Sequence, residues 1–208
     1  MVVRVAPADA TNLRELRQAL ERTDRDNGGE RSWDSMQALG EMWRAAGLAK
    51  LSALKDYMRD LLSANDEVGE ANSGKMIVFA HHLAVLDEAQ KVAVNARVGF
   101  VRIDGSTSQP DRHTAVQRFQ NDPDVRLAIL SIKAAGQGLT MTAASTVVFA
   151  EMTWVPGELL QAEDRAHRIG QRSAVCIHYL IAPVRSPSKA ILTLLQYSRN
   201  SCIPSRAR

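Results

Sequence analysis

From Lys75 onward, short apolar runs alternate with segments whose apolar residues are spaced three and four positions apart. A short continuous apolar run is typical of a strand buried on both faces, and the spaced pattern is typical of an amphipathic helix. The runs predict strands at residues 76–80, 100–103, 127–130, 147–150 and 175–182. The spaced segments predict helices at residues 82–96, 110–120, 156–169 and 189–198. This alternation predicts an α/β fold, in which helices flank a mainly parallel sheet.

The pattern before Lys75 is helical rather than alternating. Apolar residues that share one helix face predict helices at residues 12–22, 35–46 and 51–62. Polar, glycine-containing residues predict a linker at 23–31, and acidic and small residues predict an exposed loop at 64–74. We therefore expect a small helical extension with a polar linker at residues 1–62, an α/β lobe at residues 63–198 and a disordered tail at residues 199–208.

Composition narrows the class of protein without fixing its function. With 45% hydrophobic and 24% charged residues, the 208-residue chain has the balance of an ordinary globular protein. A net charge of +3 permits a nucleic-acid partner but does not require one, because Lys and Arg never occur in consecutive runs. Two cysteines cannot form a disulfide framework, and no Cys/His cluster has zinc-site spacing. We expect no metal site and, because no apolar stretch is long enough, no membrane contact.

Polar and small residues follow the predicted strands, and the sites of parallel sheets lie at the carboxyl ends of their strands. His81 follows the first strand and Asp104 follows the second. The loop after the third strand, at residues 131–140, contains Lys133, Gly136, Gly138 and Thr140. Small residues let backbone N–H groups approach a ligand closely, and Lys133 adds a positive charge. Taken singly, each feature also has a structural explanation, namely a tight turn, a capping turn or surface histidines.

The helix predicted after the fourth strand leads into residues 161–171, which have two distinct faces. An apolar stripe is formed by Leu159, Ala162, Ala166 and Ile169. On the opposite side lie Gln161, Arg165 and Arg168. Two guanidinium groups one turn apart make a fork for a polyanion, because each presents rigid, always-charged donors. The alternative is a solvated helix whose acidic residues pair with arginines four positions away.

The order of these segments resembles the second RecA-like lobe of a superfamily-two helicase, and more narrowly the Swi/Snf-type DNA-dependent ATPases. Four of that family's motifs have similar counterparts here, at residues 75–82, 103–107, 130–144 and 161–171, and the last match is the most specific. Together they resemble the annealing-helicase branch, the HepA-related (HARP-like) proteins. The resemblance covers roughly residues 43–197. The sequence departs from the family at Ser145, where Asp is common, and at Val155, where Asn is common.

The resemblance implies roles for the residues at the strand ends. Arg165 and Arg168 would reach ATP, held with Mg²⁺ mainly by a first RecA-like lobe, and neutralise charge developing on its γ-phosphate. Gln161 would contact the same phosphate, and Gly136 and Gly138 would belong to the nucleotide site. DNA phosphates would be contacted without sequence preference by His81, Asp104, Lys133 and Thr140. The family implies a role in DNA repair, fork processing or remodelling, with a nuclear location in a eukaryote and an intracellular one otherwise.

The sequence contains no Gly-x-x-x-x-Gly-Lys-[Ser/Thr] motif and no acidic Walker-B-like box. Arginine fingers need a nucleotide held by another lobe, so we expect these 208 residues alone to hydrolyse no ATP. Two functions therefore remain open. The chain is either one half of an ATP-dependent DNA motor, with a first lobe in cis or in trans, or an orphan lobe or partial gene product that binds nucleic acid or protein without ATPase activity.

Overall fold

The computed structural model describes residues 1–4, 33–66, 75–135, 139, 141–153, 156–166 and 175–181. These residues form a six-stranded sheet in the order β1-β6-β5-β2-β4-β3, and every neighbouring pair of strands is parallel. The strands are β1 (Val2–Arg4), β2 (Met76–Ala80), β3 (Gly99–Ile103), β4 (Val125–Ser131), β5 (Thr146–Phe149) and β6 (Cys176–Ile181). The predicted α/β fold with a mainly parallel sheet is confirmed.

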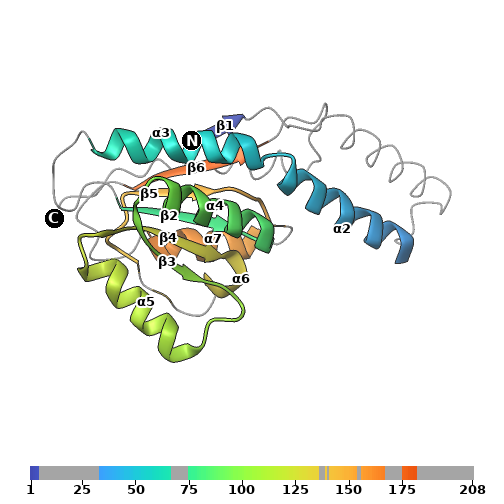
Figure 1. Ribbon diagram of the computed structural model, residues 1–208. Coiled ribbons are helices and arrows are strands. Elements are labelled where there is room, and N and C mark those ends of the chain that lie inside the picture. The colour runs from blue at the N-terminus through green and yellow to red at the C-terminus, as the bar shows by residue number, and fades with distance from the viewer. Residues whose placement is uncertain are drawn as a thin grey trace, which may run out of the picture.

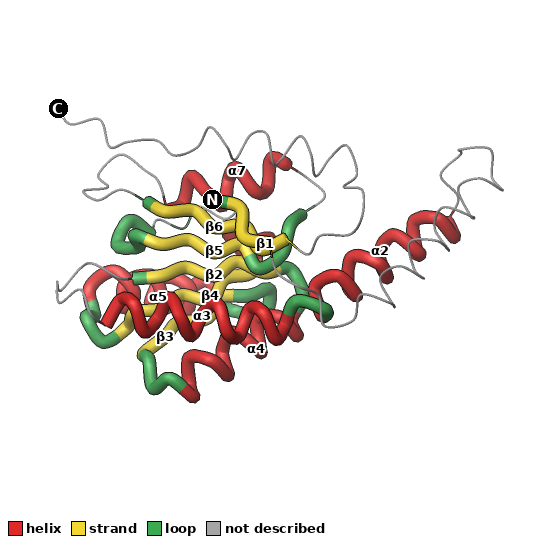
Figure 2. The backbone as a smooth tube through the Cα atoms, turned by 90° about the horizontal axis from the view of Figure 1, so that it is seen from above, coloured by secondary structure: helices red, strands yellow, loops and turns green. Residues whose placement is uncertain are grey.

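Helices lie on both faces of this sheet (Figure 1). One face packs against α3 (Leu51–Asp66) and α4 (Leu83–Asn95). The other face packs against α5 (Gln109–Asn121), the short α6 (Ile132–Ala135) and α7 (Pro156–Ala166). The remaining described helix, α2 (Trp33–Leu48), covers neither face and projects beyond the ends of the strands (Figure 2).

The side-chain alternation of β2 divides the core into these two layers. Ile77 and Phe79 belong to the cluster under α5, α6 and α7, whereas Met76, Val78 and Ala80 belong to the cluster under α3 and α4. All five side chains are fully buried, which explains the continuous apolar run in the sequence. Because both faces are packed, the register between the strands is fixed. The loops that follow the strands therefore start from fixed positions at the carboxyl ends.

Most of the predicted elements are confirmed, each to within a few residues. This applies to the five predicted strands and to the helices predicted at 35–46, 51–62, 82–96 and 110–120. The predicted loop from Ala64 is wrong at its start, because α3 continues to Asp66 through residues that do not break a helix. The predicted loop after the third strand is wrong at residues 132–135, which form α6. Strand β1 was not predicted, because three residues show no periodicity; it pairs with β6.

Several predicted segments lie outside the described residues. These are the helices at 12–22 and 189–198, the linker at 23–31, the tail at 199–208 and the end of the helix predicted at 156–169. The division of the chain at residue 62 stays a prediction. Helix α3 buries Leu54, Met58 and Leu62 in the same cluster as α4, so this part of the extension shares the core of the lobe. No helix in the described part of the chain is long and apolar enough to cross a membrane.

Candidate functional site

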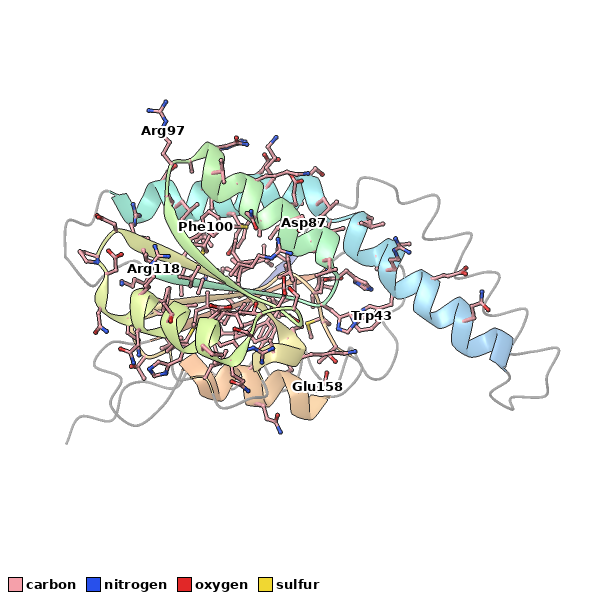
Figure 3. All side chains as sticks on the ribbon, turned by 60° about the horizontal axis from the view of Figure 1, so that its bottom comes forward. Trp43, Asp87, Arg97, Phe100, Arg118 and Glu158 are labelled. Carbon is pink, nitrogen blue, oxygen red and sulfur yellow. The ribbon has the colours of Figure 1, made fainter. Side chains whose placement is uncertain are left out.

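The carboxyl ends of the strands gather the predicted site residues at one edge of the sheet. His81 follows β2, Asp104 follows β3 and Lys133 lies in α6 directly after β4. The chain after β5 leads into α7, so all four segments leave the sheet in the same direction. Figure 3 shows Trp43, Asp87 and Glu158 toward this edge, and Arg97, Phe100 and Arg118 toward the opposite one. The charge of Lys133 is close enough to influence the pKa of His81.

A buried carboxylate, Glu151, forms the centre of this edge. Its side chain follows β5 and is 1% exposed. Its Oε2 accepts hydrogen bonds from the backbone N–H groups of His81 and His82, both at 2.8 Å. Its Oε1 lies 2.6 Å from Nδ1 of His82. These contacts tie the end of β5 to the turn between β2 and α4, and they satisfy backbone donors that the turn leaves unpaired.

The last turn of α2 packs against the same carboxylate. The indole N–H of Trp43 donates to the carbonyl oxygen of Met152 at 2.9 Å. Gly47 lies so close to Glu151 that a Cβ at this position would meet Oε1 at 2.2 Å. Just after the helix, Nζ of Lys50 donates to the carbonyl oxygens of Ala150 at 2.6 Å and Leu180 at 3.1 Å. The base of the projecting helix is therefore anchored at the candidate site.

His81 lies between the projecting helix and the strand ends. Its ring packs on the ring of Trp43, with 4.1 Å between the centroids. Its Nδ1 is buried and has no hydrogen-bond partner among the described residues. Burial lowers the pKa of His81 below its ordinary value, and the neighbouring His82 and Lys133 lower it further, against the opposing effect of two carboxylates. His81 is therefore a neutral imidazole at neutral pH, which can donate or accept a hydrogen bond but brings no fixed charge.

Asp104 shapes the turn after β3. Its Oδ1 accepts from the backbone N–H of Ser106 at 2.9 Å and from the Ser106 hydroxyl at 2.6 Å. Its Oδ2 accepts from Nε of Arg102 at 3.0 Å. The Ser106 hydrogen bonds, opposed by partial burial and assisted by Arg102, hold the pKa of Asp104 below its ordinary value. Both oxygens of this carboxylate therefore accept hydrogen bonds within the protein. The exposed residues of the turn are Gly105 and Ser106.

Helix α7 has the two faces that the sequence predicted, as far as it is described. Leu159 and Ala162 are buried against the sheet, whereas Gln161 is exposed. Glu163 is also buried, and it accepts a hydrogen bond from the hydroxyl of Tyr179 in β6. This acidic residue therefore faces the core rather than solvent. Arg165 belongs to α7, four positions after Gln161, but its side chain lies outside what the structure describes.

The rest of the predicted site lies outside the described residues. This applies to Arg168 and to the loop residues Gly136, Gly138 and Thr140. Lys133 is described, and its side chain is exposed on α6. The structure therefore brings His81, Asp104, Lys133 and the start of α7 to one edge, and the roles assigned to all these residues stay predictions.

Three residues of the candidate site were not predicted from the sequence, namely Glu151, Trp43 and Lys50. Glu151 carried a usable signal, because it is a charged residue at the end of an apolar strand, as Asp104 is. Trp43 and Lys50 carried no such signal, since both belong to a segment far from the strands in sequence. Their partners Met152 and Ala150 are 109 and 100 positions away, and only the fold brings them together.

Comparison with known proteins gives a family match and two sets of curated relatives. A family model described as the helicase conserved C-terminal domain matches residues 50–170. The human DNA annealing helicase and endonuclease ZRANB3 is 52% identical over 147 residues, which cover 71% of this chain and 13% of that protein. The SWI/SNF-related matrix-associated actin-dependent regulator of chromatin subfamily A-like protein 1 of Xenopus tropicalis is 41% identical over 182 residues, which cover 88% of this chain and 18% of that protein. The chain spans less than a fifth of either relative.

Two solved structures have a similar fold. The C-terminal part of the Fun30 ATPase domain superposes with a TM-score of 0.56 at 33% identity, covering 64% of this chain and 41% of that one. The Sulfolobus solfataricus SWI2/SNF2 ATPase core in complex with dsDNA superposes with a TM-score of 0.70, covering 96% of this chain and 43% of that one. At 20% identity, this second likeness concerns the fold alone.

Proposed function

Since the chain belongs to the family of helicase conserved C-terminal domains, we propose that it is the second motor lobe of an ATP-dependent DNA annealing helicase or translocase of the Swi/Snf type. One observation carries the proposal. Four segments that resemble the family's motifs leave the sheet at one edge, and Gln161 of α7 is exposed. This edge would form half of a site that a first lobe completes.

On the nucleotide side, Arg165 and Arg168 would act as arginine fingers. Guanidinium groups neutralise charge that develops on the γ-phosphate, which is worth about 10³-fold or more in rate. Gln161 would hydrogen-bond to the same phosphate, and Gly136 and Gly138 would give backbone N–H groups access to it. The described residues contain no group of three carboxylate, His or Cys side chains that could hold a metal ion. In this proposal Mg²⁺ is bound together with ATP, mainly by the first lobe.

On the nucleic-acid side, the same edge would contact the phosphate backbone of DNA. Lys133 offers an exposed positive charge, and neutral His81 offers a hydrogen bond. Asp104 would act by ordering the turn that exposes Ser106, because its own carboxylate is engaged. Thr140 would add a hydroxyl donor from the loop after α6. Contacts of this kind bind DNA without reading its sequence, as a translocase requires. The names of the relatives, a DNA annealing helicase and a regulator of chromatin, support a proposed role in DNA repair, fork processing or remodelling. The proposed location is nuclear in a eukaryotic cell and intracellular otherwise.

A complementation assay tests the proposal. The chain is mixed with a separately produced P-loop lobe taken from the human relative, and DNA-stimulated ATP hydrolysis is measured. Neither part alone should turn over ATP, and the mixture should. Arg165→Ala and Arg168→Ala should each lower turnover by about 10³-fold. Arg118→Ala is the matched control, because Arg118 is an exposed arginine of α5 toward the opposite end of the sheet (Figure 3).

Two outcomes would contradict the motor proposal. The first is ATP hydrolysis by the 208-residue chain alone. The second is a mixture whose turnover is unaffected by Arg168→Ala. DNA binding by the chain, with no ATPase activity in the mixture, would instead favour an orphan lobe that works as a nucleic-acid-binding module.

A further inference from the structure

We propose that Glu151 is a positioning residue, which holds the His81–His82 turn in a fixed relation to helix α7 and to the base of helix α2. The inference rests on the proposed function in one respect, because α7 is taken to carry the nucleotide contacts. Glu151 itself would touch neither nucleotide nor DNA, since its side chain is buried. It would act through the two segments that it joins.

The first step is the bond to the turn that begins α4. His82 is the N-cap residue of α4, and its side chain makes no capping hydrogen bond in the described structure. Glu151 supplies a negative charge there from a different element, and its Oε2 accepts from the N–H groups of His81 and His82. A carboxylate is favourable at a helix N-terminus, because the aligned peptide dipoles leave positive charge at that end. The conformation of the His81–His82 turn therefore depends on a residue 69 or 70 positions away.

The second step concerns residues 151–153, which are consecutive in the chain and each form a hydrogen bond to a different segment. Glu151 contacts the His81–His82 turn, Met152 accepts the Trp43 indole N–H, and the Thr153 hydroxyl donates to Oε2 of Glu158 in the first turn of α7 at 2.7 Å. Three consecutive residues thus contact three different elements. Because they are covalently joined, a displacement of the carboxylate is passed to the start of α7.

Replacing Glu151 by glutamine changes the hydrogen bonding in a defined way. A carboxylate only accepts, so Nδ1 of His82 must carry the proton in its contact with Oε1. A glutamine side chain has one accepting oxygen and one donating NH₂ group. Two backbone N–H groups occupy the oxygen, and the NH₂ group is then left facing Nδ1 of His82. Nδ1 must become an acceptor, which leaves the imidazole proton on Nε2.

The test uses the complete 208-residue chain labelled with ¹⁵N. Imidazole ¹⁵N resonances report the tautomer of His82, and the backbone amide of Gln161 reports the position of α7. Glu151→Gln should remove the proton from Nδ1 of His82, which leaves the Nε2–H form, and should shift the Gln161 amide. Glu163→Gln is the matched control for the tautomer, because it alters another buried carboxylate, one that bonds Tyr179. Glu88→Gln, a change in α4 at a partly exposed residue that pairs with Lys91, should affect neither resonance.

The functional arm uses the mixture with the P-loop lobe. Glu151→Gln should lower kcat by up to about 10²-fold, the scale expected for a misplaced catalytic group, with little change in the KM for ATP. An unchanged His82 tautomer would overturn the proposal. So would a switched tautomer that leaves both the Gln161 amide and kcat unaffected. If Glu151→Gln does not fold, Trp43→Phe removes the bond to Met152 instead, and an unshifted Gln161 amide in that variant would overturn the proposal. If the wild-type mixture has no ATPase activity, the proposed motor function is wrong. The His82 imidazole and Gln161 amide resonances then still test whether Glu151 is a positioning residue.

Discussion

Lys50 carries an ammonium group into the interior, where it donates to the carbonyl oxygens at the ends of β5 and β6. Burial lowers the pKa of Lys50 to about 8, and the nearby Glu151 partly offsets this effect. The ordinary lysine pKa is 10.5, so the folded state releases its proton at lower pH than the unfolded state does. Between these values the unfolded chain binds more protons, and linkage requires stability to increase with pH.

At the scale of the residue, we therefore predict a pH-dependent contribution from Lys50. The free energy of unfolding of the wild type, relative to Lys50→Met, should rise between about pH 8 and 10.5, by on the order of 3 kcal/mol in total. Urea denaturation of both proteins across this range measures the difference. Lys55→Met removes an exposed lysine of α3 and serves as the control. If the difference in free energy of unfolding between the wild type and Lys50→Met stays constant or falls from pH 8 to 10.5, the ammonium group of Lys50 is not buried as described.

At the scale of the element, two glycines of α2 differ in their surroundings. A Cβ at Gly47 would meet Oε1 of Glu151 at 2.2 Å, whereas a Cβ at Gly40 would meet nothing within 4 Å. The far end of a glutamate can usually move aside. Here it is held by three hydrogen bonds, so moving it would break contacts with the His81–His82 turn. Gly47 is thus required by close packing, and Gly40 is not.

Alanine at these two positions should change stability in opposite directions. Gly47→Ala should destabilise the chain by about 1–3 kcal/mol, the usual cost of overpacking. Gly40→Ala should stabilise it by about 0.5–1 kcal/mol, because alanine favours the helix. Denaturant titration of both variants measures the effects. If Gly47→Ala proves as favourable as Gly40→Ala, the anchoring of α2 on Glu151 is wrong.

The elements also show how far the sequence predicts the structure. Strands such as β2 were predictable because burial on both faces leaves a continuous apolar run. Strand β1 was not, since three residues carry no period and its place is decided by pairing with β6. Similarly, the gathering of His81, Asp104 and Lys133 followed from the parallel topology. The buried hydrogen bond of Glu163 was not predictable. In the sequence, an acidic residue near arginines indicates a solvated ion pair, and only the fold places the Tyr179 hydroxyl next to Glu163.

At the scale of the whole molecule, helices pack on both faces of the sheet, and the candidate site lies at the edge formed by the carboxyl ends of the strands. The anchored base of α2, the turns after β2 and β3, α6 and the start of α7 all meet at that edge. The sequence matches a C-terminal helicase domain over residues 50–170 and contains no P-loop. We therefore propose that the chain contributes half of a nucleotide site, and that this half recognises the nucleotide in its reacting state.

Association between the chain and a separate P-loop lobe tests that claim most directly. Binding is measured by calorimetry with Mg²⁺ and ADP, and again after aluminium fluoride is added to imitate the transferring phosphoryl group. If Arg165 and Arg168 stabilise that group, the analogue should tighten association by about 10²-fold or more, and Arg168→Ala should remove the gain. Equal affinity with and without the analogue, or a gain that Arg168→Ala leaves intact, would contradict the account.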